Sequence, residues 1–357
     1  MSLALALAKK GQGKARPNPC VGAVVVKNKK IVGRGFHEKY GSEHAEVIAL
    51  KEAGKLSKGA DLYITLEPCN HQGKTPPCTT TIISSGIANV FIAMEDPNPL
   101  VNGSGIAHLE LNGIKVIRGI MEDEAKNLNL GFINRMTKSR PYVRSKIAIS
   151  LDGKTSLSNG ESKWITSEES RADVQKWRLK SCAILTGKGT INFDNPTLSV
   201  RSVSPKQQPL RIILDSYLTI KSDSKILKES NIIIIYGEDK DLNIKKLKKN
   251  KVTFKKLPLL NNRINLGDVM AYLNELNINE LWVESGPELN GQLLSLGLLD
   301  ELITYTAPYI LGGNANSMFN APILNSMNDK IKFSVLDIRS FGEDIRIQAK
   351  PIKKDVD

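Results

Sequence analysis

The sequence predicts two successive α/β domains that meet near residue 140. The chain has 357 residues, more than one domain usually holds. In each half, short β-rich runs alternate with amphipathic stretches, a pattern typical of sheets whose strands are joined by helices. Between the halves, Ser139-Arg140-Pro141 ends a helical pattern, because proline disfavours helical backbone at the preceding residue. We therefore expect domains over 1–140 and 141–357.

The first domain is predicted to start with a hairpin and to continue with alternating helices and strands. The apolar runs 20–26 and 31–35 predict two strands around a turn at 27–30. A helix over 43–53 ends before Gly54, since glycine most readily takes the left-handed backbone that follows a helix. The other expected elements are strands over 61–66, 88–94 and 114–117, and helices over 78–85, 104–112 and 122–138.

The second domain is predicted to be α/β as well, and to end in a hairpin. Its strand-like runs are rich in isoleucine, leucine and valine, which favour buried strands. The expected strands cover 142–150, 183–186, 210–214, 232–236, 252–256, 280–284 and 301–308, with helices over 167–180, 267–276 and 287–296 and a hairpin of 331–338 with 344–350.

The composition is that of an ordinary globular protein of the cytoplasm. Apolar residues make up 41% and charged residues 24% of the chain, which disfavours disorder. No apolar run reaches the ~18–20 residues of a membrane-spanning helix, and the first ten residues do not resemble a signal peptide. Four cysteines are too few for a disulfide scaffold in so long a chain, so we read them as ligands, nucleophiles or core residues.

The positive charge does not indicate a nucleic-acid partner. The net charge is +13, with +7 in residues 1–140 and +6 in the remainder, and aromatic residues make up only 5%. A nucleic-acid protein is expected to concentrate its basic residues and to offer aromatic stacking platforms. An evenly spread excess favours a small phosphorylated substrate instead, or simply a solvated lysine surface.

Three residues of the first domain have the character of zinc ligands. They are His44, Cys69 and Cys78, and one imidazole with two thiolates leaves a fourth tetrahedral position open, as a catalytic zinc ion requires. Glu46 follows the histidine closely enough to move a proton to or from water at that position. This set of residues predicts hydrolytic removal of an exocyclic amino group, as in the zinc-dependent nucleobase deaminases.

Other interpretations of these residues remain open from the spacing alone. Eight residues separate Cys69 from Cys78, whereas the general deaminase signature has two. His71 could complete a closed structural zinc site, or the cysteines could be core residues without a metal. Cys20 and Cys182 lie in apolar runs and are expected in the core.

Longer motifs give the chain a specific resemblance. They are Pro17-Asn18-Pro19-Cys20-Val21-Gly22, His44-Ala45-Glu46, the run from Thr65-Leu66-Glu67-Pro68-Cys69 to Pro76-Pro77-Cys78, and Asp96-Pro97-Asn98-Pro99. Together they resemble the bifunctional deaminase/reductase family of bacterial riboflavin biosynthesis, in which the eight-residue gap is characteristic. The resemblance covers nearly the whole chain. It implies a cytidine-deaminase-like α/β/α sandwich followed by a dihydrofolate-reductase-like domain.

The resemblance also implies the chemistry and the residues of the first domain. The reaction is zinc-dependent deamination of 2,5-diamino-6-(5-phosphoribosylamino)pyrimidin-4-one, with His44, Cys69 and Cys78 as zinc ligands and Glu46 as the proton shuttle. The pyrimidine and its phosphate would lie among Asn18, His37, Lys74, Asp96 and Asn98. Simpler roles remain for some of these residues, because asparagines between prolines often form turns and a lone histidine is often structural.

The second domain has no G-x-G-x-x-G motif after a strand, so a Rossmann cofactor site is not supported. Glycines after strands can still bring backbone N–H groups close to a phosphate, although most such glycines only form turns. Ser150-Leu151-Asp152-Gly153-Lys154, Trp164-Ile165-Thr166 and Asp194-Asn195-Pro196 resemble the reductase domain of the same family. That resemblance implies NADPH as the hydride donor for reduction of the ribosyl group to ribityl.

The reductase residues implied by motif position fall into two groups. Those on the substrate side are Lys146, Ser162, Thr166, Arg178, Asp194, Arg201 and Glu284. Those on the cofactor side are Thr186, Gly187, Gly189, Ser285, Gly286, Gly312 and Gly313. We expect Asp194 to polarise C1′ of the substrate, or alternatively to cap a turn before Asn195. A homo-oligomer, if one forms, is expected through this domain.

Overall fold

The structure, a computed structural model, describes residues 1–72, 76–99, 101–201, 208–247, 251–321 and 323–352. The chain divides into two compact units, Met1–Arg140 and Pro141–Asp357. Each unit is described by itself below. No helix in the described part of the chain has both the length and the apolar character needed to cross a membrane.

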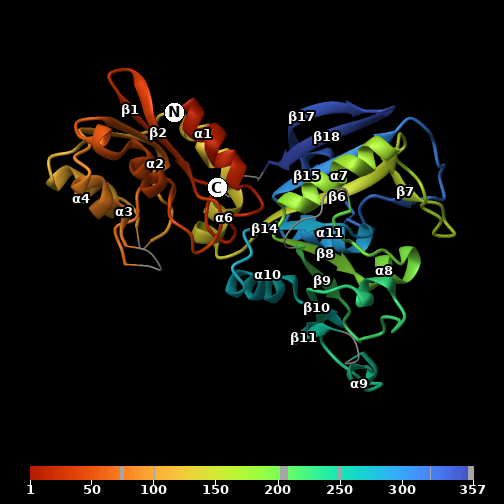
Figure 1. Cartoon of the computed structure of the whole chain (residues 1–357). Coiled ribbons are helices and arrows are strands. Elements are labelled where there is room, and N and C mark those ends of the chain that lie inside the picture. Colours follow the sequence, from red (N-terminus) through yellow and green to blue (C-terminus); the bar gives the residue numbers. More distant parts are fainter. Residues whose placement is uncertain (73–75, 100, 202–207, 248–250, 322, 353–357) are drawn as a thin grey trace. The chain divides into compact units, whose positions relative to one another are not determined.

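The first unit is built on a five-stranded mixed sheet (Figure 1). Its strands are β1 (Gly22–Lys27), β2 (Lys30–Phe36), β3 (Asp61–Leu66), β4 (Asn89–Met94) and β5 (Lys115–Ile117), in the order β2-β1-β3-β4-β5. Strand β1 is antiparallel to β2 and β3, while β3, β4 and β5 are parallel. The carboxyl ends of β3 and β4 therefore lie at the same edge, where ligands of open α/β sheets usually bind.

Helices cover both faces of this sheet. On one face lie α2 (Ala45–Ala53), α3 (Cys78–Ser84) and α4 (Ser104–Leu111), which contribute Leu50, Ile82 and Leu109 to the core. On the other face lie α1 (Ser2–Ala8) and α5 (Glu122–Leu128). The predicted α/β/α sandwich is confirmed.

Helix α2 packs unusually close to β2. A Cβ atom on Gly33 or Gly35 would collide with the carbonyl oxygens of Ala49 and Ala45, respectively. Glycine at these two positions lets the helix backbone rest directly on the strand. The start of α2, and the residues that bear chemistry there, are thereby fixed against the sheet.

The helix expected over 122–138 is two helices in the structure. Helix α5 ends at Leu128, and α6 (Leu130–Lys138) begins after Asn129. The Asn129 side chain accepts a hydrogen bond from the Cys20 N–H at 2.8 Å and donates one to the Cys20 carbonyl at 3.0 Å. This contact with a distant segment fixes the junction between the helices, and local periodicity carries no signal for it.

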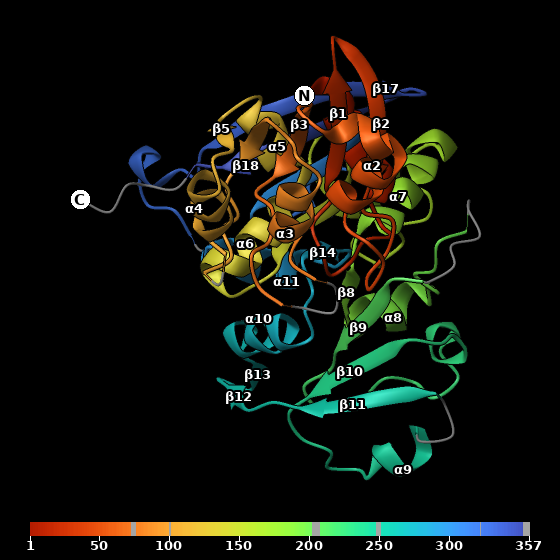
Figure 2. The same ribbon diagram turned by 60° about the vertical axis from the view of Figure 1, so that its left-hand side comes forward.

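The second unit is built on a nine-stranded sheet. Its strands are β6 (Tyr142–Ser150), β8 (Ala183–Gly187), β9 (Leu210–Leu214), β10 (Ile232–Tyr236), β11 (Val252–Lys256), β14 (Glu280–Val283), β15 (Glu301–Ala307), β17 (Phe333–Phe341) and β18 (Asp344–Pro351). The order is β11-β10-β9-β8-β14-β6-β15-β18-β17, parallel from β11 to β15 and antiparallel beyond. Figure 2 shows β9, β10 and β11 side by side, and Figure 1 shows the β17–β18 hairpin.

Two hydrophobic cores lie on opposite faces of this sheet. Helices α7 (Glu168–Lys180) and α8 (Lys188–Asp194) contribute to one core, and α10 (Leu266–Glu275) and α11 (Pro287–Ser295) to the other. Helix α8 was not expected, because its glycine-containing start reads as a loop. Also unexpected are α9 (Asn243–Leu247) and the short pairs β7 (Lys154–Ser156) with β16 (Asn316–Ser317) and β12 (Leu259–Leu260) with β13 (Arg263–Ile264).

The three tryptophans of the chain all lie in the second unit. Trp177 of α7 stacks on Trp282 of β14, with ring centroids 5.6 Å apart and planes 6° from parallel. Trp282 is fully buried, whereas Trp164 is 64% exposed. The stacked pair anchors α7 to the centre of the sheet.

Candidate active sites

His44, Cys69 and Cys78 come together at one edge of the first sheet. His44 directly precedes α2, Cys78 begins α3, and Cys69 lies in the loop after β3. The His44 Nδ1 atom is 3.1 Å from Cys78 Sγ and 3.6 Å from Cys69 Sγ, and all ligand atoms lie within 4.8 Å of one another. One imidazole and two thiols at this spacing fit three corners of a tetrahedral zinc site.

The two thiols of this cluster lie in direct contact. A hydrogen bond from Cys78 lowers the pKa of Cys69 below its ordinary value. The same contact, together with burial, raises the pKa of Cys78. Because the thiolate is the form that binds metals, the cluster already stabilises one sulfur ligand in its reactive state.

Glu46 lies in the first turn of α2 and is 3% exposed. Its Oε2 atom is buried and has no hydrogen-bond partner among the described residues. Burial raises the pKa of this carboxyl to about 7, although the nearby His44 opposes the shift. A buried carboxyl that changes charge near neutral pH is suited to accept and deliver a proton.

Asn18 and His37 lie beside this cluster. Asn18 Nδ2 is 3.0 Å from His37 Nε2, and His37 Nδ1 is 3.1 Å from the Glu43 carbonyl. The His37 ring meets the His44 ring edge-on, with centroids 5.4 Å apart. Burial lowers the pKa of His37, and a neutral ring with its proton on Nδ1 satisfies both hydrogen bonds.

Asp96 and Asn98 follow β4 at the same edge of the sheet. Asp96 Oδ1 accepts the Asn98 N–H at 2.9 Å. Burial raises the pKa of Asp96 to about 6, assisted by the charges of Glu67 and Cys69. Lys74, the remaining residue predicted for this pocket, lies outside the described residues.

The alternative interpretations of the cysteines gain no support from the geometry. His71 is exposed and does not belong to the cluster of His44, Cys69 and Cys78. Cys20 and Cys182, expected in the core, are only half-buried. Cys20 lies in a loop held by Asn129, and Cys182 packs at the margin of a core.

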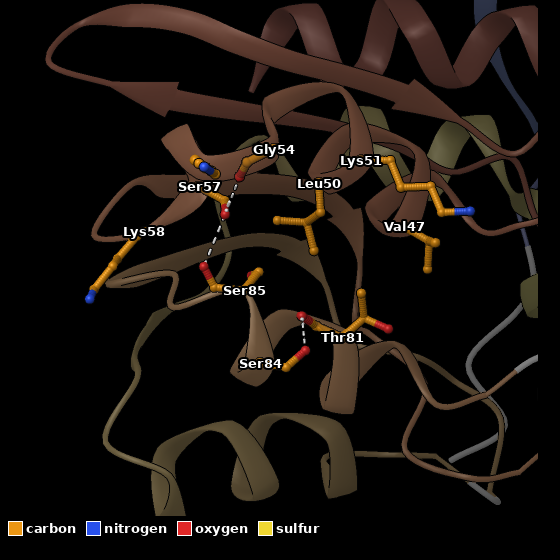
Figure 3. Close-up of a pocket in the computed structure, with 10 residues that line it drawn as sticks. Val47, Leu50, Lys51, Gly54, Ser57, Lys58, Thr81, Ser84 and Ser85 are labelled. Carbon is orange, nitrogen blue, oxygen red and sulfur yellow. Dashed lines mark hydrogen bonds between the residues drawn. The ribbon is translucent and has the colours of Figure 1, made fainter.

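A separate hollow of about 580 Å³ on the first unit contains none of the predicted site residues (Figure 3). It lies between α2 and α3. Its serine hydroxyls donate to backbone carbonyls, as Ser57 does to Gly54 and Ser85, and Ser84 to Thr81. The remaining polar groups of its lining are mainly lysines, and no predicted role falls on them.

In the second unit, a charged cluster forms where β14 and β6 run in parallel. Glu284 follows β14, and Lys146 lies on β6 one residue beyond the pair Val283–Ser145. Arg178 of α7 donates from Nε and Nη2 to the two Glu284 oxygens at 2.5 and 2.9 Å. Burial alone would raise the pKa of Glu284, but Arg178, with help from Lys146 and Trp282, holds it at about 2.

Asp194 completes this cluster. It is the last residue of α8, and its Oδ1 accepts a hydrogen bond from the Ser162 hydroxyl at 3.0 Å. Burial lowers the pKa of Lys146, and the charges of Glu284 and Asp194 oppose this shift. The turn after α8 is made by Asn195, whose φ is 46°.

Thr166 and Arg201 were also predicted on the substrate side, but their hydrogen bonds are to other residues. The Thr166 carbonyl accepts a hydrogen bond from Arg171, and the Arg201 N–H donates to Gln175 at 2.7 Å. Arg201 is exposed. Among the described residues, neither side chain bonds to Glu284 or Asp194.

The glycine-bearing loops lie at the carboxyl ends of the central strands. No atom lies within 4 Å of a Cβ built on Gly187, Gly189, Gly286, Gly312 or Gly313. The Thr186 hydroxyl next to them is buried and has no partner in the part of the chain that the structure describes, whereas the Ser285 hydroxyl donates to Asn290. Open backbone with an unsatisfied hydroxyl fits a nucleotide cofactor, whose phosphates accept such donors.

Two further polar residues form hydrogen bonds with these loops, and the sequence had not predicted a role for either. Asp152 accepts the N–H groups of Leu311 and Gly312 at 3.1 and 2.9 Å. Asn290 accepts hydroxyl bonds from Ser145 and Ser285. Asp152 belongs to a recognised motif, but the pattern did not show which backbone groups it would bind.

Comparisons with known proteins agree with this arrangement. Family models match at residues 1–94, the cytidine and deoxycytidylate deaminase zinc-binding region, and at residues 141–347, the RibD C-terminal domain. The riboflavin biosynthesis protein RibD of Bacillus amyloliquefaciens is 44% identical over 357 residues, covering 98% of this chain and 95% of that protein. The chain belongs to the RibD family.

Solved structures of the family share the fold over the whole length. The Acinetobacter baumannii RibD structure, form 1, has a TM-score of 0.90 at 39% identity and covers 99% of this chain and 98% of that one. A deaminase/reductase from Thermotoga maritima has a TM-score of 0.87 at 35% identity, covering 99% and 97%. RibD of Escherichia coli K12 is 41% identical over 97% of this chain and 96% of its own.

The chain is thus a bifunctional enzyme of riboflavin biosynthesis that acts on a small pyrimidine substrate. Its deaminase domain, with the zinc-binding region, is amino-terminal, and its NADPH-dependent RibD reductase domain is carboxyl-terminal. The fold class, the family resemblance and both cofactors predicted from the sequence are confirmed.

Proposed function

We propose that residues 1–140 deaminate 2,5-diamino-6-(5-phosphoribosylamino)pyrimidin-4-one and that residues 141–357 reduce the product to 5-amino-6-(5-phosphoribitylamino)uracil. The Thermotoga maritima relative is described as a diaminohydroxyphosphoribosylaminopyrimidine deaminase and 5-amino-6-(5-phosphoribosylamino)uracil reductase. The observation that carries the proposal is the unpartnered, buried Glu46 oxygen beside a three-ligand cluster. That combination suits hydrolysis at a carbon bearing an amino group.

In the deaminase, His44, Cys69 and Cys78 would hold the zinc ion. Zinc held there would supply an activated water by lowering its pKa. Glu46 would accept a proton at its carboxylate and deliver it to the departing amino group, which leaves as ammonia. The pyrimidine is oriented by the amide, ring and carboxylate groups of Asn18, His37, Asp96 and Asn98. The phosphate would be bound by Lys74.

In the reductase, the glycine-bearing loops and Thr186 would hold NADPH, which supplies the hydride when bound. The cofactor residues are Thr186, Gly187, Gly189, Ser285, Gly286, Gly312 and Gly313. Asp194, oriented by Ser162, polarises C1′ of the substrate for hydride transfer. The substrate and its phosphate are bound by Lys146, Arg178, Glu284, Thr166 and Arg201. The hydrogen bonds between Arg178 and Glu284 keep the guanidinium group in one orientation.

Replacing Asp194 with asparagine is expected to stop the second reaction and spare the first. The amide keeps the shape of the side chain but lacks the charge and the acid–base function of the carboxyl group, and loss of such a group typically costs ~10²–10⁴-fold in rate. Ammonia release and NADPH oxidation are measured on the same sample. Asp329→Asn, at an exposed position of the same unit, is the control, and a parallel fall in ammonia release would refute the assignment.

We infer that the second unit also forms a homodimer through its last hairpin. Strand β17 is the outermost strand of the sheet, and it exposes Val335 and Ile338 to 56% and 62%. An apolar edge strand is usually covered by a partner. Sedimentation of the whole enzyme should give a dimer, and a monomeric mass would contradict this inference.

A cytoplasmic location is part of the same proposal. The two thiols of the cluster, Cys69 and Cys78, must stay reduced to bind a metal. A reducing compartment preserves them in that state. Recovery of the enzyme outside the cytoplasmic fraction of cells would argue against it.

A further inference from the structure

Glu67 is a buried carboxylate that takes no part in the deamination described above. It follows β3, lies near Cys69 in the chain and is 3% exposed. Its two oxygens accept four backbone hydrogen bonds. Oε2 accepts from Asp96 at 3.1 Å and Gly103 at 3.0 Å, and Oε1 from Gly105 at 3.0 Å and Ile106 at 3.3 Å.

These bonds join two segments that both belong to the proposed deaminase site. One segment leads from β3 to the ligand Cys69, and the other leads from β4 through Asp96 to α4. A Cβ atom on Gly105 would collide with the Pro68 carbonyl, so the two backbones are in direct contact. The Asn70 side chain adds a longer bond, 3.4 Å, to the Ser104 carbonyl.

The geometry of these four bonds needs two oxygens that both accept. The carboxyl group of glutamate offers two oxygens with about four acceptor positions between them. Glutamine would place an NH₂ group against two of the four donors. Its single oxygen could hold only part of the segment, although its size and shape match those of glutamate.

We propose that Glu67 is a positioning residue of the deaminase, which holds Asp96 and the start of α4 against the Cys69 loop so that Asp96 faces the pyrimidine. The proposal rests on the substrate role proposed for Asp96. Glu67 touches neither the reacting atoms nor a metal ligand through its side chain. It acts through the backbone it binds, so its loss should first affect substrate binding.

The test is Glu67→Gln in the full-length, zinc-loaded enzyme. We expect the KM for the diaminopyrimidine phosphate to rise, by up to about 10²-fold, because small misplacements of orienting groups have effects of that size. Zinc should remain at one per chain, and reduction of the deaminated compound by NADPH should be unchanged. Glu110→Gln, at an exposed position of α4, is the matched control and should leave the KM of both reactions unchanged.

A merely structural role would give a different result. Partial unfolding lowers kcat and zinc content together and leaves the KM of the remaining enzyme unchanged, and that outcome would overturn the proposal. Combining Glu67→Gln with Asp96→Asn should raise KM by less than the product of the two single effects, since both act on one contact. If Asp96→Asn alone leaves KM unchanged while Glu67→Gln raises it, the role proposed for Asp96 fails and the positioning by Glu67 stands.

A second variant keeps the proposal testable if Glu67→Gln does not fold. Gly103 donates to Glu67 and has a φ of 86°, with open space where a Cβ would lie. Gly103→Ala strains the backbone there without a steric clash. It should raise the KM for the pyrimidine at full zinc occupancy, and an unchanged KM would count against Glu67 as a positioning residue.

Discussion

Replacing Glu46 with glutamine is expected to leave zinc bound and to slow ammonia release by ~10²–10⁴-fold. The amide fits the same buried space at the start of α2 but cannot gain and lose a proton. The carboxyl it replaces is poised to do so, because burial raises its pKa to about 7 and its Oε2 has no partner in the described structure. Elemental analysis and steady-state ammonia release are the measurements.

The control for this variant is Glu43→Gln. Glu43 is a partly exposed carboxylate just before α2 that pairs with Lys51, so its replacement should change neither zinc content nor rate by much. Near-normal deamination by Glu46→Gln would mean that another group moves the proton. Loss of zinc from this variant would instead mean that Glu46 helps to hold the metal.

Replacing Cys69 with serine is expected to remove zinc and abolish deamination, while reduction of the deaminated compound continues. A serine hydroxyl stays protonated at neutral pH and is a poor zinc ligand, whereas the hydrogen bond from Cys78 lowers the pKa of Cys69 and so favours its thiolate. The remaining His44 and Cys78 would leave two positions of the tetrahedron open. Zinc per chain and the two half-reactions are measured separately.

Cys182→Ser is the matched control for this loss. Cys182 is a half-buried cysteine of the second unit and lies outside the cluster, so its replacement should leave zinc content unchanged. Full zinc retention by Cys69→Ser would overturn the ligand assignment. A parallel loss of reductase activity would show that the two activities are not carried independently.

The sequence predicted the strands of the fold well because buried strands have a simple composition. The bounds expected for β3, β6, β9, β10 and β11 agree with the structure, and each is a short run rich in β-branched or apolar residues. The expectation of one helix over 122–138 was wrong, since a hydrogen-bonded contact between Asn129 and Cys20 separates α5 from α6. Local periodicity cannot anticipate a contact that spans more than a hundred residues.

In the candidate sites, the metal ligands could be predicted from the sequence, but the residues that hold the backbone around them could not. His44, Cys69 and Cys78 could be selected from the sequence because few residue types bind zinc, and the structure brings their ligand atoms together. Glu67 and Asp152 could not, because a carboxylate that accepts backbone N–H bonds looks in sequence like any other carboxylate. The backbone segments that they hold are defined only by the folded chain.

The tryptophan fluorescence of the enzyme comes from the second unit alone. All three lie in residues 141–357, and the indole of Trp282 donates a hydrogen bond to Glu284 at 2.9 Å within the reductase cluster. Excitation of indole therefore excites only that half of the chain, and the reduced nicotinamide absorbs where indole emits. Intrinsic fluorescence follows events at the reductase site directly, while the deaminase site, which has no tryptophan in its unit, contributes no indole emission of its own.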